Sequence, residues 1–261
     1  MSLTVLVYGH PGSGKSPVLA TAPGRTLWLA AESGYRHIER EKVLWDPRSA
    51  MPKDIPEGSM TVVRLLPDTV GPSPDVWDNA RRVLEILVSG KHQFDSVAVD
   101  TLSSLQNHVI SYATSKSRRG EMDQQGWGIV LRELMAYVSI LTDQVDNARK
   151  PLDIVAASAE LAERKEGETE FTPDVSGSAR KALIQMFDVL GFLVVSSSFD
   201  PSTGAPQATD RRMAIVPGYG AQARDRTSTR QDGGLSRILG SPEGVLSGPI
   251  DLAELNRIVT K

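Results

Sequence analysis

Short apolar runs alternate with helical periodicity along the first 158 residues. The runs are rich in Val, Leu and Ala and are bounded by Gly, Pro or Asp, which is typical of buried strands. The strands predicted in this part of the chain are residues 4–8, 25–31, 60–66, 96–100 and 152–157. The predicted helices are residues 15–21, 77–88, 102–115 and 129–148. Strands that alternate with helices indicate an α/β fold with a mainly parallel sheet and helices on both faces.

The pattern changes after residue 158. Residues 160–172 are charged and interrupted by glycine, which favours a loop or hairpin. A helix is predicted over 179–187, and strands over 189–197 and 212–216 at the far edge of the sheet. From residue 217 the chain is rich in Gly, Arg and Ser until a short apolar end at 250–258. We therefore predict one core over residues 1–216, and a tail over 217–261 that packs on the core or on a neighbouring subunit.

Composition narrows the class of protein without defining it. The sequence has no cysteine, so disulfides and thiolate metal sites are excluded, which fits a reducing cytoplasm. No apolar run reaches about 18 residues and no signal peptide precedes the first strand, so we expect neither a membrane partner nor export. The net charge of −3 argues against a uniformly basic surface for nucleic acid. Any such surface has to be local.

A phosphate-binding motif of the form G-x-x-x-x-G-K-S follows the first predicted strand and opens the first predicted helix. Its residues, with the next one, are Gly9, His10, Pro11, Gly12, Ser13, Gly14, Lys15, Ser16 and Pro17. The glycines let backbone N–H groups turn towards a phosphate, and the helix N-terminus adds partial positive charge. Lys15 is expected to meet the β- and γ-phosphates, and Ser16 to ligate Mg²⁺. The motif therefore predicts ATP and Mg²⁺ as cofactors.

Two carboxylates end predicted strands that belong to the same sheet. Asp100 closes the apolar run SVAVD, where it is expected to bind Mg²⁺ through water; the alternative is an N-cap for the helix that begins at 102. Glu32 follows the run 25–31, where it is expected to activate the water that attacks the γ-phosphate. Its alternative is a capping acid for a helix after Gly34.

The segments VAVDTLSSL and LWLAAESG resemble the corresponding strands of RecA-like ATPases, and no N-K-x-D segment of a GTPase occurs. Further elements are QGWG at 125–128, PDVSGSA at 173–179 and ARDR at 223–226. In this order, over about residues 3–230, the sequence resembles small phage-encoded RecA-core ATPases of the Sak-type, AAA-like group of single-strand-annealing recombinases. The resemblance implies a RecA-like P-loop NTPase core with C-terminal strands and an Arg-rich tail. It also implies a polar γ-phosphate sensor, for which Ser158 and Glu160 are available.

The resemblance implies that two loops, 115–128 and 161–181, contact single-stranded DNA. The DNA-binding candidates are Lys116, Arg118, Arg119, Trp127, Arg180 and Lys181. The first loop has a net charge of +1 and the second of −1, so binding through them is expected to be modest and salt-sensitive. For Trp127 the alternative to base stacking is a core position. For residues 116–119 the alternatives are a solvated loop and the Arg-rich lid of a kinase.

The segment 210–237 carries a net charge of +3. The resemblance implies that Arg224 or Arg226 reaches the γ-phosphate of a neighbouring subunit as an arginine finger. DNA binding and a solvated basic tail are the alternatives.

The function expected from the whole pattern is that of an ATP-hydrolysing phage recombination protein. It would bind single-stranded DNA and promote annealing or strand exchange as a homo-oligomer, either a ring or a filament. It would act in the host cytoplasm beside phage or host replication and recombination proteins. Two other functions remain open. The chain could be a nucleotide or small-molecule kinase, or an accessory module that binds ATP tightly and hydrolyses little of it.

Overall fold

The computed structural model describes residues 2–66, 74–117, 121–163, 171–175, 179–199, 206–215, 224–225, 245–247 and 250–260. The strands of its single sheet lie in the order β10-β8-β7-β1-β6-β5-β2-β4-β3, and β9 pairs with β7 off this path. Seven strands run parallel: β1 (Leu3–Gly9), β2 (Thr26–Ala30), β3 (Lys42–Leu44), β4 (Met60–Arg64), β5 (Ser96–Asp100), β6 (Ile154–Glu160) and β7 (Val189–Phe199). β8 (Pro206–Ala214), β9 (Arg224–Asp225) and β10 (Val245–Ser247) are antiparallel to their partners.

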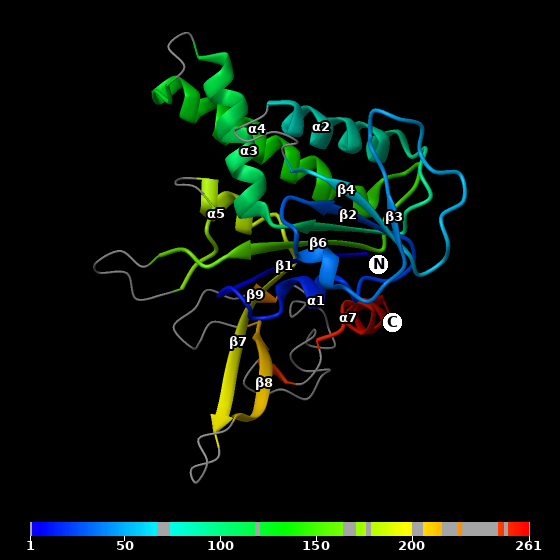
Figure 1. Ribbon diagram of the computed structural model, residues 1–261, viewed down its shortest axis with the longest axis vertical. Coiled ribbons are helices and arrows are strands. Elements are labelled where there is room, and N and C mark those ends of the chain that lie inside the picture. Colours follow the sequence, from blue (N-terminus) through cyan, green and yellow to red (C-terminus); the bar gives the residue numbers. More distant parts are fainter. Residues whose placement is uncertain are drawn as a thin grey trace.

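Helices cover both faces of the sheet, as the alternating pattern predicted (Figure 1). One face carries α2 (Pro74–Ser89), α3 (Leu102–Lys116) and α4 (Gln124–Thr142); the other carries α1 (Lys15–Leu19) and α7 (Leu252–Thr260). Because side chains alternate along a strand, each face has its own core. Leu27 and Leu29 of β2 belong to the first core, whereas Trp28 belongs to the second, which also contains Leu252. The predicted mainly parallel α/β fold is confirmed.

The strand register gathers the ends of the central strands at one edge. Gly9 at the end of β1 lies beside Glu160 of β6 and Leu193 of β7. Asp100 at the end of β5 lies beside Ala30 of β2. Since these strands are parallel, the segments that leave their carboxyl ends meet at the same edge, which is where α/β folds bind ligands.

Several predicted bounds were wrong. The fourth helix was expected over 129–148, but α4 begins at Gln124 because the side chain of Asp123 accepts a 2.7 Å hydrogen bond from the Gly126 N–H. The helix ends at Thr142, and a 3₁₀ turn, Asp143–Asp146, follows. The last strand was predicted over 212–216, whereas β8 pairs with β7 from Pro206 to Ala214. The short edge strand β3 was missed.

The apolar C-terminal end forms α7, and α5 (Ala179–Ile184) lies beside α4. Leu252 and Leu255 of α7 are buried against the second core. Among the described residues, none of the helices combines the length and the apolar character that crossing a bilayer requires.

Candidate nucleotide-binding site

The loop between β1 and α1 has the backbone of a phosphate-binding turn. It is closed by a 3.1 Å hydrogen bond from the Ser13 N–H to the His10 carbonyl. Gly12 and Gly14 have φ angles of +78° and +95°, a region that side chains other than glycine's rarely adopt. At Gly9 the constraint is space, because a Cβ there would lie 2.8 Å from the Leu193 carbonyl oxygen. The motif glycines are therefore required by conformation at two positions and by close packing at the third.

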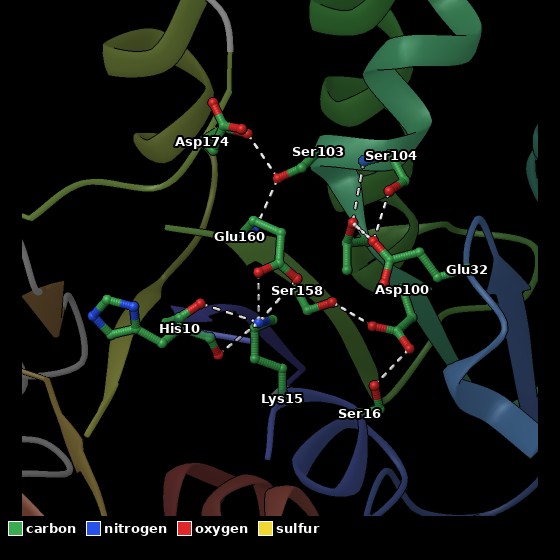
Figure 2. Close-up of polar contacts among 12 residues, drawn as sticks. His10, Lys15, Ser16, Glu32, Asp100, Ser103, Ser104, Ser158, Glu160 and Asp174 are labelled. Carbon is green, nitrogen blue, oxygen red and sulfur yellow. Dashed lines mark hydrogen bonds and ion pairs between the residues drawn. The ribbon is translucent and has the colours of Figure 1, made fainter. Parts of the chain in front are cut away.

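Lys15 lies across this loop and is only 7% exposed. Its ammonium donates to the carbonyl oxygens of Gly9 (3.0 Å) and His10 (3.1 Å). It also forms an ion pair with Glu160 at 3.0 Å (Figure 2). His10, Pro11, Gly12 and Pro17 are exposed around it, whereas Ser13 is buried. The positive charge is thus fixed at the point where the loop turns.

Asp100 joins the loop to the sheet. Its Oδ2 accepts a 2.8 Å hydrogen bond from Ser16, and its Oδ1 accepts one of 2.6 Å from Ser158. Burial raises the pKa of Asp100, while the hydrogen bonds from Ser158 and Ser16 act in the opposite direction and the charge of Glu32 adds to the rise. A divalent cation here would favour the ionised carboxylate.

The capping alternatives for both carboxylates are wrong. Thr101, not Asp100, is the N-cap of α3: its hydroxyl accepts a 3.1 Å hydrogen bond from the Ser104 N–H. The 3₁₀ turn Gly34–His37 begins after Ser33 and has no side-chain cap. Glu32 therefore does not cap that turn.

Glu32 is held instead by two hydroxyl groups from the start of α3. Its Oε1 accepts hydrogen bonds of 2.8 Å from Thr101 and 2.6 Å from Ser104 (Figure 2). Within the described part of the chain, its Oε2 accepts none. Sequence reasoning missed Thr101 and Ser104. The signal was present in the run D-T-L-S-S that follows β5, although no role was assigned to its hydroxyls.

A third hydroxyl of the same run, Ser103, connects the site to a neighbouring segment. It accepts a 2.9 Å hydrogen bond from the Glu160 N–H and donates one of 2.7 Å to the Asp174 carbonyl. The Asp174 N–H donates to the Glu160 carbonyl at 2.8 Å, and the Tyr8 hydroxyl donates to the Phe171 carbonyl at 3.0 Å. Residues 171–175 are thereby fixed against the end of β6.

The site fits a magnesium nucleotide. The hydroxyl of Ser13 is buried and has no hydrogen-bond partner among the described residues, as expected for a donor that awaits an anionic ligand. A Cβ at Gly34 would lie 3.1 Å from the Ser16 hydroxyl and 3.4 Å from Asp100 Oδ2, so glycine leaves room beside this pair. No group of three or more His, Asp or Glu side chains suited to a metal occurs in the described ranges. A cation held by Ser16 and Asp100 would need phosphate and water ligands, as Mg²⁺ commonly has.

Four of the six DNA-binding candidates, Lys116, Trp127, Arg180 and Lys181, lie in the described part of the chain. Trp127, near the start of α4, is 46% exposed, so its core alternative is wrong. Lys116 ends α3 with its ammonium 5.2 Å from the centre of the Tyr112 ring. Arg180 donates to the Val175 carbonyl (3.2 Å) and the Thr172 hydroxyl (2.8 Å), so its guanidinium is engaged in contacts within the chain. Lys181 is exposed.

Three arginine candidates, Arg118, Arg119 and Arg226, lie outside the described residues. Arg224 lies in β9, where its backbone pairs with Leu190 of β7. Leu190 lies three residues before Leu193, the residue of β7 that pairs with Gly9. The structure therefore brings Lys15, Ser16, Asp100 and Glu32 together but does not test the arginine element.

Fold and site together define a P-loop nucleotide-binding domain. The model of a family described as AAA domain matches residues 1–227, and the chain belongs to this family. The predicted P-loop fold with a mainly parallel sheet and helices on both faces is confirmed, and the domain is an AAA-type P-loop ATPase domain. The narrower resemblance to Sak-type recombinases stays a prediction.

Among solved structures, the chain is similar to the flagellar accessory protein FlaH from Methanocaldococcus jannaschii. The two share 10% identity with a TM-score of 0.40, over 85% of this chain and 79% of the other. No curated protein sequence matches.

Proposed function

We propose that this chain binds ATP with Mg²⁺ and hydrolyses it. One observation carries the proposal: a buried lysine, a serine–aspartate pair and an oriented glutamate meet at the end of the P-loop strand (Figure 2). Such a set supplies the recognised parts of phosphoryl transfer to water, which are a phosphate cradle, metal ligands and a water-positioning carboxylate.

Each residue has a distinct part in this proposal. The loop N–H groups and Lys15 would hold the β- and γ-phosphates. Ser16 would ligate Mg²⁺ directly and Asp100 would hold it through water; when bound, the cation neutralises phosphate charge. The two hydroxyls on Glu32 Oε1 leave Oε2 to accept a hydrogen bond from the attacking water and then its proton.

Phosphate release from ATP tests this function. The full chain should release phosphate from ATP in the presence of Mg²⁺ and stop when EDTA removes the cation. Transfer of the phosphoryl group to an added nucleotide or small-molecule acceptor, with little release to water, would favour the kinase. Tight binding without turnover would favour the accessory module.

We further propose that the chain binds single-stranded DNA and that ATP hydrolysis drives a reaction on this DNA. The last turns of α3 and the first turns of α4 project beyond the sheet (Figure 1). Lys116 ends α3 and Trp127 lies near the start of α4, and both are exposed. An exposed aromatic ring suits base stacking, and an exposed ammonium suits phosphate contact. We propose that the chain promotes annealing or strand exchange as a homo-oligomer in the host cytoplasm, alongside phage or host recombination proteins. Arg224 or Arg226 would complete the site of the neighbouring subunit.

The DNA proposal has its own test. Trp127→Ala should lower the stimulation of hydrolysis by single-stranded DNA without changing the basal rate. Leu44→Ala is the matched control, since Leu44 is also an exposed apolar residue (65%) but lies on β3, the edge strand beyond β4. No stimulation by single-stranded DNA in the unaltered chain would contradict the proposal while leaving ATP hydrolysis intact.

A further inference from the structure

The ammonium of Lys15 directs all three of its N–H donors to groups of the protein itself. Two are directed to the carbonyl oxygens of Gly9 and His10, and the third to the carboxylate of Glu160. Since an ammonium group has three donors, a phosphate can gain a hydrogen bond from Lys15 only if one of these contacts opens. The carbonyls belong to the loop backbone itself, so the side chain of Glu160 is the partner that can leave.

The backbone of Glu160 is fixed, which confines this movement to the side chain. Its N–H donates to the Ser103 hydroxyl (2.9 Å) and its carbonyl accepts from the Asp174 N–H (2.8 Å). The strand register also holds it beside Gly9. Its carboxylate is 29% exposed, so a path towards solvent is open to it. Glu160 can therefore retreat from Lys15 but stays close to the phosphate site.

We propose that Glu160 is a specificity-determining residue that occupies the place of the γ-phosphate on Lys15 and sets the relative affinity of the site for triphosphate and diphosphate. This inference rests on the nucleotide binding proposed above. A γ-phosphate has to displace the carboxylate from Lys15 and then lies near its negative charge, and both effects weaken binding. A diphosphate ends one phosphate earlier and leaves the Lys15–Glu160 pair in place.

Nucleotide affinities of the full chain test the proposal. Titration calorimetry with Mg²⁺ would compare the non-hydrolysable triphosphate AMP-PNP with ADP, for the unaltered chain and for Glu160→Gln. The neutral amide keeps the shape of the side chain and removes its charge. Replacing a charge-assisted hydrogen bond by a neutral one should tighten AMP-PNP binding about 3- to 10-fold, with ADP changed less than about twofold.

Two further variants keep the test sharp. Glu160→Ala removes the partner altogether and should shift the affinities in the same direction. Glu163→Gln is the matched control, because it removes an exposed carboxylate three residues away and should change neither affinity.

Two outcomes would overturn the inference while the chain still binds nucleotide: unchanged AMP-PNP affinity, or an equal gain for ADP. Unchanged affinity together with a large loss of hydrolysis would make Glu160 a catalytic base instead. If the unaltered chain binds neither nucleotide, the proposed function has failed as well, so the two failures are distinguishable.

Discussion

Replacing Glu32 by Gln isolates the charge of the proposed general base. The amide oxygen of Gln can still accept the hydrogen bonds from Thr101 (2.8 Å) and Ser104 (2.6 Å), so the side chain should keep its position. What is lost is the capacity of Oε2 to take a proton from water. Losing a general base costs about 10²-fold or more in rate, which corresponds to about 2.7 kcal/mol of transition-state free energy.

A second variant measures the contribution of orientation. Ser104→Ala removes the shorter of the two hydrogen bonds to Glu32 but leaves the negative charge. A hydrogen bond to a charged group contributes about 1.5–3 kcal/mol, and the Thr101 hydroxyl would retain part of the orientation. We therefore expect a smaller loss of rate for Ser104→Ala, about tenfold.

The assay is steady-state phosphate release at saturating Mg²⁺ and ATP, with nucleotide affinity measured separately. Both variants should bind ATP within about threefold of the unaltered chain, because neither side chain is assigned to the phosphates. A Glu32→Gln chain that hydrolyses ATP at the normal rate would refute the assignment of Glu32 as the base. A Ser104→Ala loss as large as that of Glu32→Gln would show that position, not charge, is what matters.

The remaining predictions concern the metal and pH. Asp100→Asn should weaken the dependence of nucleotide binding on Mg²⁺. It should also raise the melting temperature of the metal-free chain by a few degrees, because burial disfavours the ionised carboxylate, as its raised pKa indicates. Calorimetry with and without Mg²⁺ and a thermal melt check the two parts. Burial lowers the pKa of His92 to about 4, and the charge of Lys150 adds to this effect. Below pH 6.5 the unfolded chain therefore takes up a proton that the folded chain does not. As a result the free energy of unfolding falls between pH 6.5 and 4. His92→Phe should reduce this fall in the free energy of unfolding, which is at most about 1.4 kcal/mol per pH unit and smaller for a partly exposed ring. Urea unfolding at several pH values measures it. The same pH dependence in the variant and the unaltered chain would contradict the prediction.

Features of the fold and site that depend on residues close together in the chain could be predicted from the sequence. The P-loop is a local signal, and the alternation of apolar runs with helical periodicity predicted the parallel sheet. The predicted ends of helices and strands were less accurate where local signals conflict. Residues 115–128 were expected to form a loop, yet the cap at Asp123 starts α4 at Gln124.

Contacts between distant residues were beyond prediction. Glu32 meets Ser104 across 72 positions, and Lys15 meets Glu160 across 145, so only the strand order and register bring them together. Trp127 shows the same limit within one helix. Trp127 lies seven positions before the buried Leu134, about 20° around the helix, and is nevertheless 46% exposed. Its exposure goes with the first turns of α4, which project beyond the sheet, and the periodicity of the helix does not show this (Figure 1).

The central claim is that Lys15 binds the phosphates of a magnesium nucleotide, and titration calorimetry of the full chain with Mg²⁺ and AMP-PNP tests it most directly. Lys15→Ala removes the ammonium at the turn of the loop, whereas Lys91→Ala removes an exposed lysine elsewhere and serves as the control. The unaltered chain and Lys91→Ala should bind one nucleotide per chain with equal affinity. Lys15→Ala should bind about 100-fold more weakly, the scale of losing one or two charge-assisted hydrogen bonds. Equal affinity for Lys15→Ala and the unaltered chain would contradict the claim.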